Sequence, residues 1–374
     1  MNYEDIRPYN DDEYHQVIQE LFEIKPLMAT IDNYLTELSL PQIKEMMLGY
    51  GTIQEFQSKM VCNFISRIIQ RSVNNFSYDG ILNLAKEESY LLLSNHRDIV
   101  LDSALINYSL NDQKYNTSEI AIGDNLLSKE WIKKLVRVNK SFIVKRNLPK
   151  EEMLPSSQNL SAYIAHTLKE KKQSVWIAQR EGRAKDGFDK TNPGLLKMFG
   201  MAADGKLLDH LIGLNITPVS LAYELDPCDV FKVPELLKKA AGETYVKAKG
   251  EDEQNMLLGI QGHKGNVHIQ FGTPINEKIK GLADVKNRNQ LLKGVAEIID
   301  AEIYKNYKLW NSNYVAYDLL NSTNKYVSNY DEKGKEKFQD YMSEQLKDLA
   351  GNKEAEQLFL KMYANPTINA EGAK

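Results

Sequence analysis

The spacing of apolar residues divides the chain into three parts. Over residues 12–73, apolar side chains such as Val17 and Leu21 recur every three or four positions, which is the period of an amphipathic helix. The same spacing returns after residue 284, in segments such as NQLLKGVAEIIDAEIYKNY and KEKFQDYMSEQLKDL. Between these parts, short apolar runs alternate with helical stretches. The pattern therefore predicts a mixed central region with a helical extension at each end.

The central region has the pattern of alternating strands and helices. Its strand candidates are short apolar runs between polar segments: SYLLLS, EIAIGD, SFIVKR, SVWIAQ, ITPVSLAY and NVHIQFG. Such alternation predicts an α/β fold, with a central mostly parallel-to-mixed sheet and helices on both faces. We predict a helical N-terminal extension over residues 1–80, the α/β domain over 81–282, a helical C-terminal extension over 283–365 and a flexible tail over 366–374.

The composition is that of a globular protein and carries no signal for nucleic acid or metal. Of the 374 residues, 42% are hydrophobic and 26% are charged, which excludes a disordered chain. The formal net charge of −4 gives no overall attraction to nucleic acid, so no nucleic-acid partner is predicted. Cys62 and Cys228 have no Cys or His at ligand spacing, which indicates a reducing compartment and no metal site.

No segment has the pattern of a membrane-spanning helix. The charge-free stretch over residues 210–223 has 14 residues, whereas a spanning helix needs about 20 apolar ones. The first residues, MNYEDIRPYNDDEYHQ, lack the features of a secretory signal. We therefore predict a cytoplasmic protein that contacts a membrane only peripherally, on its inner face. Residues 129–150, rich in Lys and Arg around Trp131, are either that contact or a solvated helix covering the sheet.

The first candidate for chemistry is His96, which follows the apolar run SYLLLS at a strand-to-helix turn. Catalytic groups in open α/β sheets gather at the carboxyl ends of strands. A histidine held there by a carboxylate accepts a proton from a hydroxyl near neutral pH, and Asp98 and Asp102 both follow closely. The alternatives are a surface histidine beside a capping aspartate, or a serine nucleophile at Ser94 or Ser103. Neither serine lies in a Gly-x-Ser-x-Gly sequence, which disfavours the second alternative.

Three further strand candidates end in residues of chemical interest. The run SFIVKR ends in Lys145 and Arg146, a pair of cations suited to a phosphate group. The run SVWIAQ leads into the polar loop REGRAK at residues 180–185. Pro218 interrupts the run ITPVSLAY, which indicates an edge position or a strand start and would suit the lining of an apolar pocket. Taken singly, each of these charged segments has a plain alternative as a solvated loop.

Together, the segments over residues 89–274 resemble the glycerolipid acyltransferase superfamily, the glycerol-3-phosphate and lysophosphatidate acyltransferases. The family's first motif is Asn-His-x-x-x-x-Asp. Here the NHR at residues 95–97 resembles its opening, and Asp102 lies six residues after His96 where the motif has five. FIVKR is similar to the second motif, an apolar run ending in Arg. The EGR at residues 181–183 resembles the third motif, Glu-Gly-x-Arg, with its Arg one place early, and TPVS resembles the fourth, a Pro within a strand.

The resemblance implies a role for each matched residue. His96 would be the general base on an acceptor hydroxyl, and Asp102 would orient it, with Asp98 as the alternative acid. Pro218 would shape an acyl channel. Residues that would hold the acceptor's phosphate are Lys145, Arg146, Glu181, Gly182 and Arg183, with Lys185 as an alternative to Arg183, and Arg97 as either a further phosphate contact or a turn salt bridge.

The function implied by this resemblance is acyl transfer in phospholipid biosynthesis. The donor would be a thioester, acyl-CoA or acyl carrier protein, and the acceptor the hydroxyl of glycerol 3-phosphate or lysophosphatidate at a membrane surface. The hydroxyl would attack the thioester directly, with neither an acyl-enzyme nor a bound cofactor. Two alternatives stay open: an O-acyltransferase acting on an aminolipid or another lysolipid, and a non-catalytic lipid-binding relative.

Overall fold

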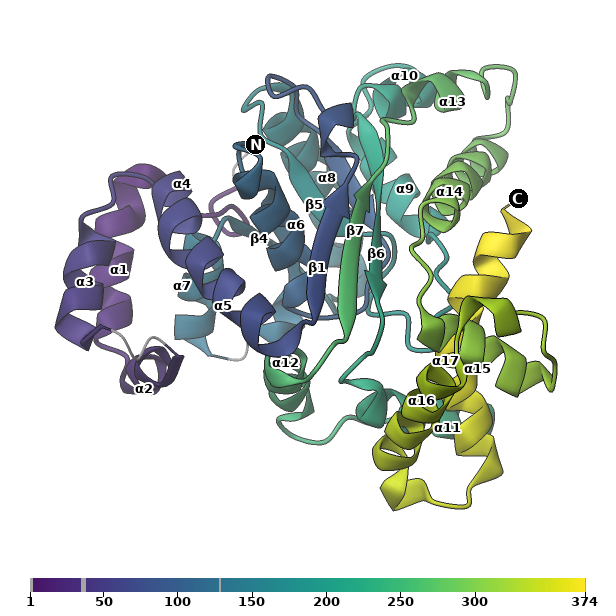
Figure 1. Cartoon of the computed structure of the whole chain (residues 1–374). Helices are drawn as coiled ribbons and strands as arrows, with labels where there is room; N and C mark the ends of the chain where they lie inside the picture. Colours follow the sequence, from purple (N-terminus) through teal and green to yellow (C-terminus); the bar gives the residue numbers. More distant parts are fainter. Residues whose placement is uncertain (1–2, 35–37, 128, 374) are drawn as a thin grey trace.

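One mixed sheet forms the centre of the molecule (Figure 1). The computed structural model describes residues 3–34, 38–127 and 129–373. Within them, seven strands form a sheet in the order β1-β7-β6-β2-β5-β3-β4. Neighbouring strands are parallel except for β6 and β7. The strands are β1 (Asn75–Asp79), β2 (Leu91–Ser94), β3 (Glu119–Gly123), β4 (Ser141–Val144), β5 (Val175–Ala178), β6 (Ile216–Tyr223) and β7 (Asn266–Phe271).

The sheet confirms the predicted α/β fold. Each of the six apolar runs forms a strand, β2 to β7. The first strand, β1, was not predicted and lies before the boundary expected at residue 81. It is an edge strand of sequence NFSYD whose residues are exposed or half-buried, so its sequence lacks a continuous apolar run. The predicted N-terminal boundary is therefore too late, whereas the boundary expected after residue 282 stays a prediction.

Helices cover both faces of the sheet, and each face has its own apolar core. In the fully buried strand β2, Leu91 and Leu93 pack into one core and Leu92 into the other. Side chains from α8 (Lys150–Lys169), α9 (Pro193–Phe199) and α14 (Arg288–Lys305) complete the first core. Those from α5 (Cys62–Ser72) and α6 (Leu101–Asp112) complete the second.

The N-terminal helices form a separate bundle at one side of the sheet (Figure 1). Their apolar side chains share a core with α7, which lies between β3 and β4. Trp131 and Leu135 of α7 pack into this core, so that helix turns its apolar face towards the protein. The members of this N-terminal bundle are α1 (Tyr14–Phe22), α2 (Lys25–Tyr34), α3 (Leu40–Leu48) and α4 (Ile53–Phe56), and they pack on α7 (Glu130–Val138).

The C-terminal helices pack around α11 at the opposite side of the molecule (Figure 1). The last helix continues to Gly372, so the prediction of a flexible tail over residues 366–374 is wrong for the part that the structure describes. The cause is packing, because Pro366, Thr367 and Asn369 are buried in this helix. The members of this C-terminal bundle are α11 (Asp229–Ala240), α15 (Asn311–Asn321), α16 (Glu332–Gln345) and α17 (Lys353–Gly372).

Short helical elements connect these layers. The remaining α-helices are α10 (Leu207–Ile212), α12 (Glu251–Gln261) and α13 (Asn276–Lys280). Single helical turns occur at η1 (Asp11–Glu13), η2 (Gln57–Val61), η3 (Ile81–Asn83), η4 (Asp124–Leu126), η5 (Gly200–Ala202), η6 (Val327–Asn329) and η7 (Lys347–Leu349). Among the helices that the structure describes, none combines the length and apolar character that crossing a bilayer requires.

Candidate active site

His96 and Asp102 form a hydrogen-bonded pair at the carboxyl end of β2. The His96 Nδ1 lies 2.8 Å from the Asp102 Oδ2. The Asp102 side chain is fully buried, whereas 14% of the His96 side chain is exposed. A carboxylate can only accept, so Nδ1 donates and the proton-free nitrogen is Nε2. Among the described residues, we find no hydrogen bond to Nε2, which leaves it available to a hydroxyl.

The Asp102 carboxylate is held by four donors. Its Oδ2 accepts from His96 and from the backbone N–H groups of Arg97, at 2.6 Å, and Asp98, at 3.1 Å. Its Oδ1 accepts from the Tyr223 hydroxyl at 2.9 Å. Asp102 also lies in the first turn of α6, where the helix dipole stabilises negative charge. These contacts fix the carboxylate in one orientation, and they fix His96 with it.

Asp98 has a different task. Its Oδ1 accepts from the backbone N–H groups of Val100, at 2.8 Å, and Leu101, at 2.7 Å. These bonds satisfy free donors where α6 begins. Burial raises the pKa of Asp98, and the neighbouring Asp102 charge adds to the rise. Of the two candidate acids, Asp102 therefore contacts His96 while Asp98 caps the helix.

The two serines near His96 are engaged elsewhere. Ser94 is fully buried; its hydroxyl donates to the Asn95 carbonyl at 2.8 Å and accepts from the Trp176 Nε1 at 3.0 Å. The Ser103 hydroxyl points at the Val100 carbonyl, 3.4 Å away. Within the described residues, neither hydroxyl has a hydrogen bond to His96. The geometry thus disfavours a serine nucleophile.

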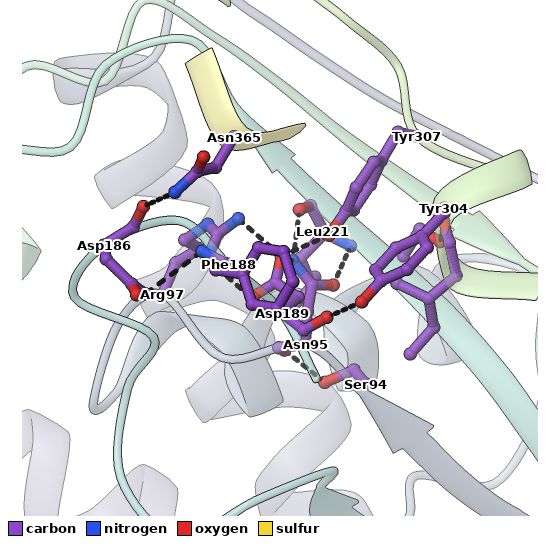
Figure 2. A network of polar contacts seen from close by, with 12 residues as sticks. Ser94, Asn95, Arg97, Asp186, Phe188, Asp189, Leu221, Tyr304, Tyr307 and Asn365 are labelled. Atoms are coloured by element: carbon purple, nitrogen blue, oxygen red, sulfur yellow. Dashed lines mark hydrogen bonds and ion pairs between the residues drawn. The ribbon is translucent and has the colours of Figure 1, made fainter. Parts of the chain in front are cut away.

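Arg97 is paired inside the protein. Its two terminal nitrogens lie 2.7 and 2.6 Å from the two carboxylate oxygens of Asp189, which is fully buried (Figure 2). Burial raises the pKa of Asp189 and the Arg97 guanidinium opposes that rise. Because both nitrogens already bind Asp189, the salt-bridge alternative for Arg97 is favoured over a phosphate contact.

The other predicted cations lie at the same edge of the sheet, because β2, β3, β4 and β5 are parallel. Arg146 forms an ion pair with Glu181 at 2.8 Å, so the ends of β4 and β5 are joined. Lys145 is instead paired with Asp5 near the N-terminus. Lys185 is paired with Glu235 of α11, and burial lowers its pKa.

Arg183 differs from these cations because one of its buried donors has no hydrogen-bond partner among the described residues. Its Nη2 donates to the Asn255 side chain of α12 at 2.9 Å. Its Nη1 is buried, and we find no hydrogen-bond partner for it in the described part of the chain. Gly182 before it has a φ of +71°, a left-handed conformation that glycine adopts without strain. Of the two alternatives, Arg183 rather than Lys185 offers an unpaired donor.

The segment that carries these residues matches a known family. Residues 75–221 match the family model described as Acyltransferase. This segment therefore has the sequence features of an acyltransferase domain. Among solved structures, it is similar to the 1-acyl-sn-glycerophosphate acyltransferase PlsC from Thermotoga maritima, at 11% identity over 77% of this chain and 95% of that chain, with a TM-score of 0.38. No curated protein gave a match.

Pro218 lies in an interior strand of the acyltransferase domain, beside Leu93 of β2. The hydroxyl of Ser220, two residues on and so on the same face of β6, donates to the Ile303 carbonyl of α14. Trp176, whose ring packs edge-on against the His96 imidazole at 5.9 Å, belongs to the core on the other face. Pro218 therefore faces α14, and its predicted place in an acyl channel stays a prediction.

Several polar residues of the acyltransferase domain were missed at the level of sequence. Tyr223 and Asn255 contact the predicted Asp102 and Arg183, and Asp189 contacts Arg97. Only Tyr223 had a usable signal, since it ends a predicted strand at the carboxyl edge of the sheet. In the described ranges, no group of three or more His, Cys, Asp or Glu side chains is arranged to hold a metal ion.

Several cations of the segment over residues 129–150 are engaged within the protein. Lys134 pairs with Glu20 at 2.5 Å, and the Arg137 guanidinium lies 4.4 Å from the Tyr9 ring centre. Lys140 is half-buried and donates to the Thr117 hydroxyl at 3.0 Å. Together with the buried apolar face of α7, these contacts favour the alternative of a helix that covers the sheet.

Proposed function

We propose that the protein transfers a fatty acyl group from a thioester donor, acyl-CoA or acyl carrier protein, to the hydroxyl of glycerol 3-phosphate or lysophosphatidate. The observation that carries this proposal is the His96–Asp102 pair at the carboxyl end of β2, with the imidazole Nε2 open. The acyltransferase family match of the surrounding segment supports it.

His96 acts as general base in this reaction. Its Nε2 takes the proton of the acceptor hydroxyl while that oxygen attacks the thioester carbonyl carbon. The resulting tetrahedral intermediate collapses, the carbon–sulfur bond breaks, and the imidazolium returns the proton to the leaving thiolate. Asp102 holds the imidazole in the productive tautomer and stabilises its positive form. The chemistry needs no bound cofactor and no covalent acyl-enzyme.

Arg183 is the residue that best suits the acceptor's phosphate. Its buried Nη1 is an unpaired donor, and guanidinium groups bind phosphate through paired hydrogen bonds. We assign Arg146 to the same phosphate, because its ion-pair partner Glu181 is two residues from Arg183 in the sequence. Gly182 permits the turn between them. Lys145 would join these residues when a phosphate displaces its exposed partner Asp5.

The class of acceptor also determines whether the protein must contact a membrane. Lysophosphatidate and long acyl chains reside in bilayers, so the proposal includes peripheral contact with a membrane surface from the cytoplasmic side. Met153 and Leu154 in the first turns of α8, which begins shortly after Arg146, are 54% and 57% exposed and offer apolar contacts for such a surface.

The test is acyl transfer measured by mass spectrometry. Glycerol 3-phosphate, lysophosphatidate, an aminolipid and another lysolipid are each offered with each donor, with and without phospholipid vesicles. The proteins compared are wild type, His96→Ala, Asp102→Asn and Asp98→Asn. We expect His96→Ala and Asp102→Asn to lose about 10³-fold in kcat, since each removes base catalysis. Asp98→Asn keeps the capping acceptor, so it should stay within about threefold of wild type.

Four outcomes would contradict the proposal. If His96→Ala retains wild-type transfer, His96 is not the base. If Asp98→Asn loses as much as Asp102→Asn, the assignment of the two acids is wrong. If wild type yields product only with an aminolipid or another lysolipid, the acceptor is wrong although the chemistry stands. A folded wild type that transfers to no acceptor would indicate a lipid-binding relative without catalysis.

A further inference from the structure

Asp189 is the centre of a buried polar network next to the catalytic turn (Figure 2). Besides the two bonds from Arg97, its carboxylate accepts from the Tyr307 hydroxyl and, at 3.4 Å, from the Asn95 side chain. The Tyr304 hydroxyl donates to its backbone carbonyl. Every polar atom of this fully buried carboxylate is therefore satisfied.

The network is joined to His96 through the backbone of Arg97. The Arg97 N–H donates at 2.6 Å to Asp102 Oδ2, the same oxygen that accepts from the His96 Nδ1. The Arg97 carbonyl in turn accepts from the Lys232 ammonium of α11 at 3.0 Å. Arg97 is therefore fixed at its side chain by Asp189 and at its backbone on both sides. A shift of its guanidinium would be transmitted to the donor that orients Asp102.

A second hydrogen bond holds the peptide group between His96 and Arg97 at its carbonyl oxygen. The backbone N–H of Ala184, in the loop that also carries Asp189, donates to the His96 carbonyl at 3.0 Å. Two elements outside the segment that matches the family fix this loop. Tyr304 and Tyr307, in and just after α14, bind Asp189, and the Asn365 side chain of α17 donates to the Asp186 carbonyl at 2.7 Å (Figure 2).

From these contacts we infer that Asp189, held by Tyr307, is a positioning residue for His96 and Asp102. It acts through Arg97 and touches no reacting atom. The inference rests on the proposed function, in which His96 is the base. It assigns the C-terminal region a part in the reaction, because Tyr307, just after α14, supplies a hydroxyl that orients the carboxylate behind the catalytic turn.

The competing explanation is that the network contributes only to folding. Tyr341 allows the two to be separated, because its hydroxyl donates at 2.8 Å to another fully buried carboxylate, Asp229, which within the described residues has no hydrogen bond to the catalytic turn itself. Tyr341→Phe and Tyr307→Phe each remove one tyrosine hydroxyl from a buried aspartate. A role in folding alone predicts similar consequences for the two variants.

The experiment combines kinetics with a signal that needs no substrate. In ¹⁵N-histidine-labelled full-length protein, the Nδ1–H proton of His96 is assigned by its absence in His96→Ala. This proton reports the hydrogen bond to Asp102 directly. The variants are Tyr307→Phe, Asp189→Asn and the control Tyr341→Phe, and kcat and KM are measured for each with the donor and acceptor that wild type uses.

We expect the His96 Nδ1–H signal to shift or to be lost to exchange in Asp189→Asn and Tyr307→Phe and to stay unchanged in Tyr341→Phe. We expect kcat to fall by about 100-fold in Asp189→Asn and by about tenfold in Tyr307→Phe, with KM within about threefold of wild type in both. The reason is that a misplaced base slows the chemical step more than it weakens binding. Tyr307→Phe, which changes a single oxygen, keeps the test valid if Asp189→Asn does not fold.

An unchanged signal and kcat in Tyr307→Phe would overturn the inference, as would an equal loss in Tyr341→Phe. Failure of the proposed function gives a different result, in which wild type transfers no acyl group while the His96 signal still responds to Tyr307→Phe. The positioning of His96 by Asp189 would then stand without the acyl transfer.

Discussion

The two helical extensions of this acyltransferase domain contact it in different ways. The C-terminal bundle, with α14, meets the loops around the catalytic turn through hydrogen bonds that are partly or fully buried. The half-buried Asn365 side chain donates to the Asp186 carbonyl at 2.7 Å, and the Tyr307 hydroxyl donates to the fully buried Asp189 carboxylate (Figure 2). The N-terminal bundle lies at the opposite side of the molecule and packs on α7 (Figure 1). Its ion pairs to the domain, such as Lys134 with Glu20, have side chains that are 30% and 39% exposed.

This difference separates an extension that supports the site from one that covers the sheet. Buried hydrogen bonds cannot be exchanged for bonds to water, so losing one leaves an unsatisfied group that costs about 1–3 kcal/mol. Exposed ion pairs contribute about 0–1 kcal/mol. We therefore expect changes in the C-terminal contacts to alter both stability and transfer, and changes in the N-terminal pairs to alter neither strongly.

The largest effect is expected at Gly187, where the loop that carries Asp189 meets α17. Gly187 has a φ of +72°, and an added Cβ would lie 2.1 Å from the Met362 carbonyl oxygen. Gly187→Ala must therefore push the loop away from α17. We expect the free energy of unfolding to fall by about 2–4 kcal/mol, from left-handed strain and the overlap together, and kcat to fall at least about tenfold. Urea denaturation and acyl transfer measure the two.

A matched control isolates the contact from the backbone strain. Gly351, between η7 and α17, has a φ of +80°, but an added Cβ would have nothing within 4 Å. Gly351→Ala should cost only the strain, about 1 kcal/mol, and leave kcat unchanged. Equal losses in Gly187→Ala and Gly351→Ala would show that the contact with α17 does not support the site.

The next effect concerns the packing of the C-terminal bundle and depends on pH. Asp229 is fully buried at the start of α11, where its Oδ2 accepts from the Tyr341 and Tyr363 hydroxyls at 2.8 Å each. Burial raises its pKa to about 8, and the Asp226 charge adds to the rise. Between about pH 4 and pH 8 the unfolded chain therefore releases a proton that the native state keeps. Stability should fall as the pH rises through this window.

The variant Asp229→Asn tests whether Asp229 causes this fall in stability with rising pH. The amide stays neutral, so the variant should lose much of the fall in stability between pH 5 and pH 8 and exceed wild type at pH 8 by about 1–3 kcal/mol. Urea denaturation at both pH values measures it, with the exposed Asp348→Asn as the control that should follow wild type. A parallel pH dependence of wild type and Asp229→Asn would show that another group is responsible.

How much of this structure the sequence predicts depends on how far apart in the sequence the interacting residues lie. Strands β2 to β7 are predictable because their buried residues form short apolar runs. Contact between His96 and one of two nearby aspartates was predictable because these residues are close in sequence, with Asp102 six positions after His96. In contrast, the polar end of α17 has no periodic pattern of apolar residues. It is helical because it packs against the rest of the protein, which the sequence pattern does not reveal.

The support of the catalytic turn could not be predicted from local patterns. Tyr307 and Asp189 are separated by 118 positions, and Tyr223 and Asp102 by 121. Their contacts depend on the order of the strands and on where α14 crosses the sheet, which no spacing in one sequence specifies. The choice between Asp98 and Asp102 stayed open at that level for a related reason, because both lie within reach of His96 until the turn's backbone is known.

The smallest effect is expected at the N-terminal side, where Lys145 pairs with Asp5. The two side chains are 38% and 52% exposed, so water and salt screen the pair. Asp5→Asn should change the free energy of unfolding by less than about 0.5 kcal/mol and leave kcat unchanged. Since the substitution also releases Lys145, KM for a phosphorylated acceptor should stay the same or fall. A loss of kcat as large as that of Gly187→Ala would show that the N-terminal extension supports the site as strongly as the C-terminal one, and the distinction between them would fail.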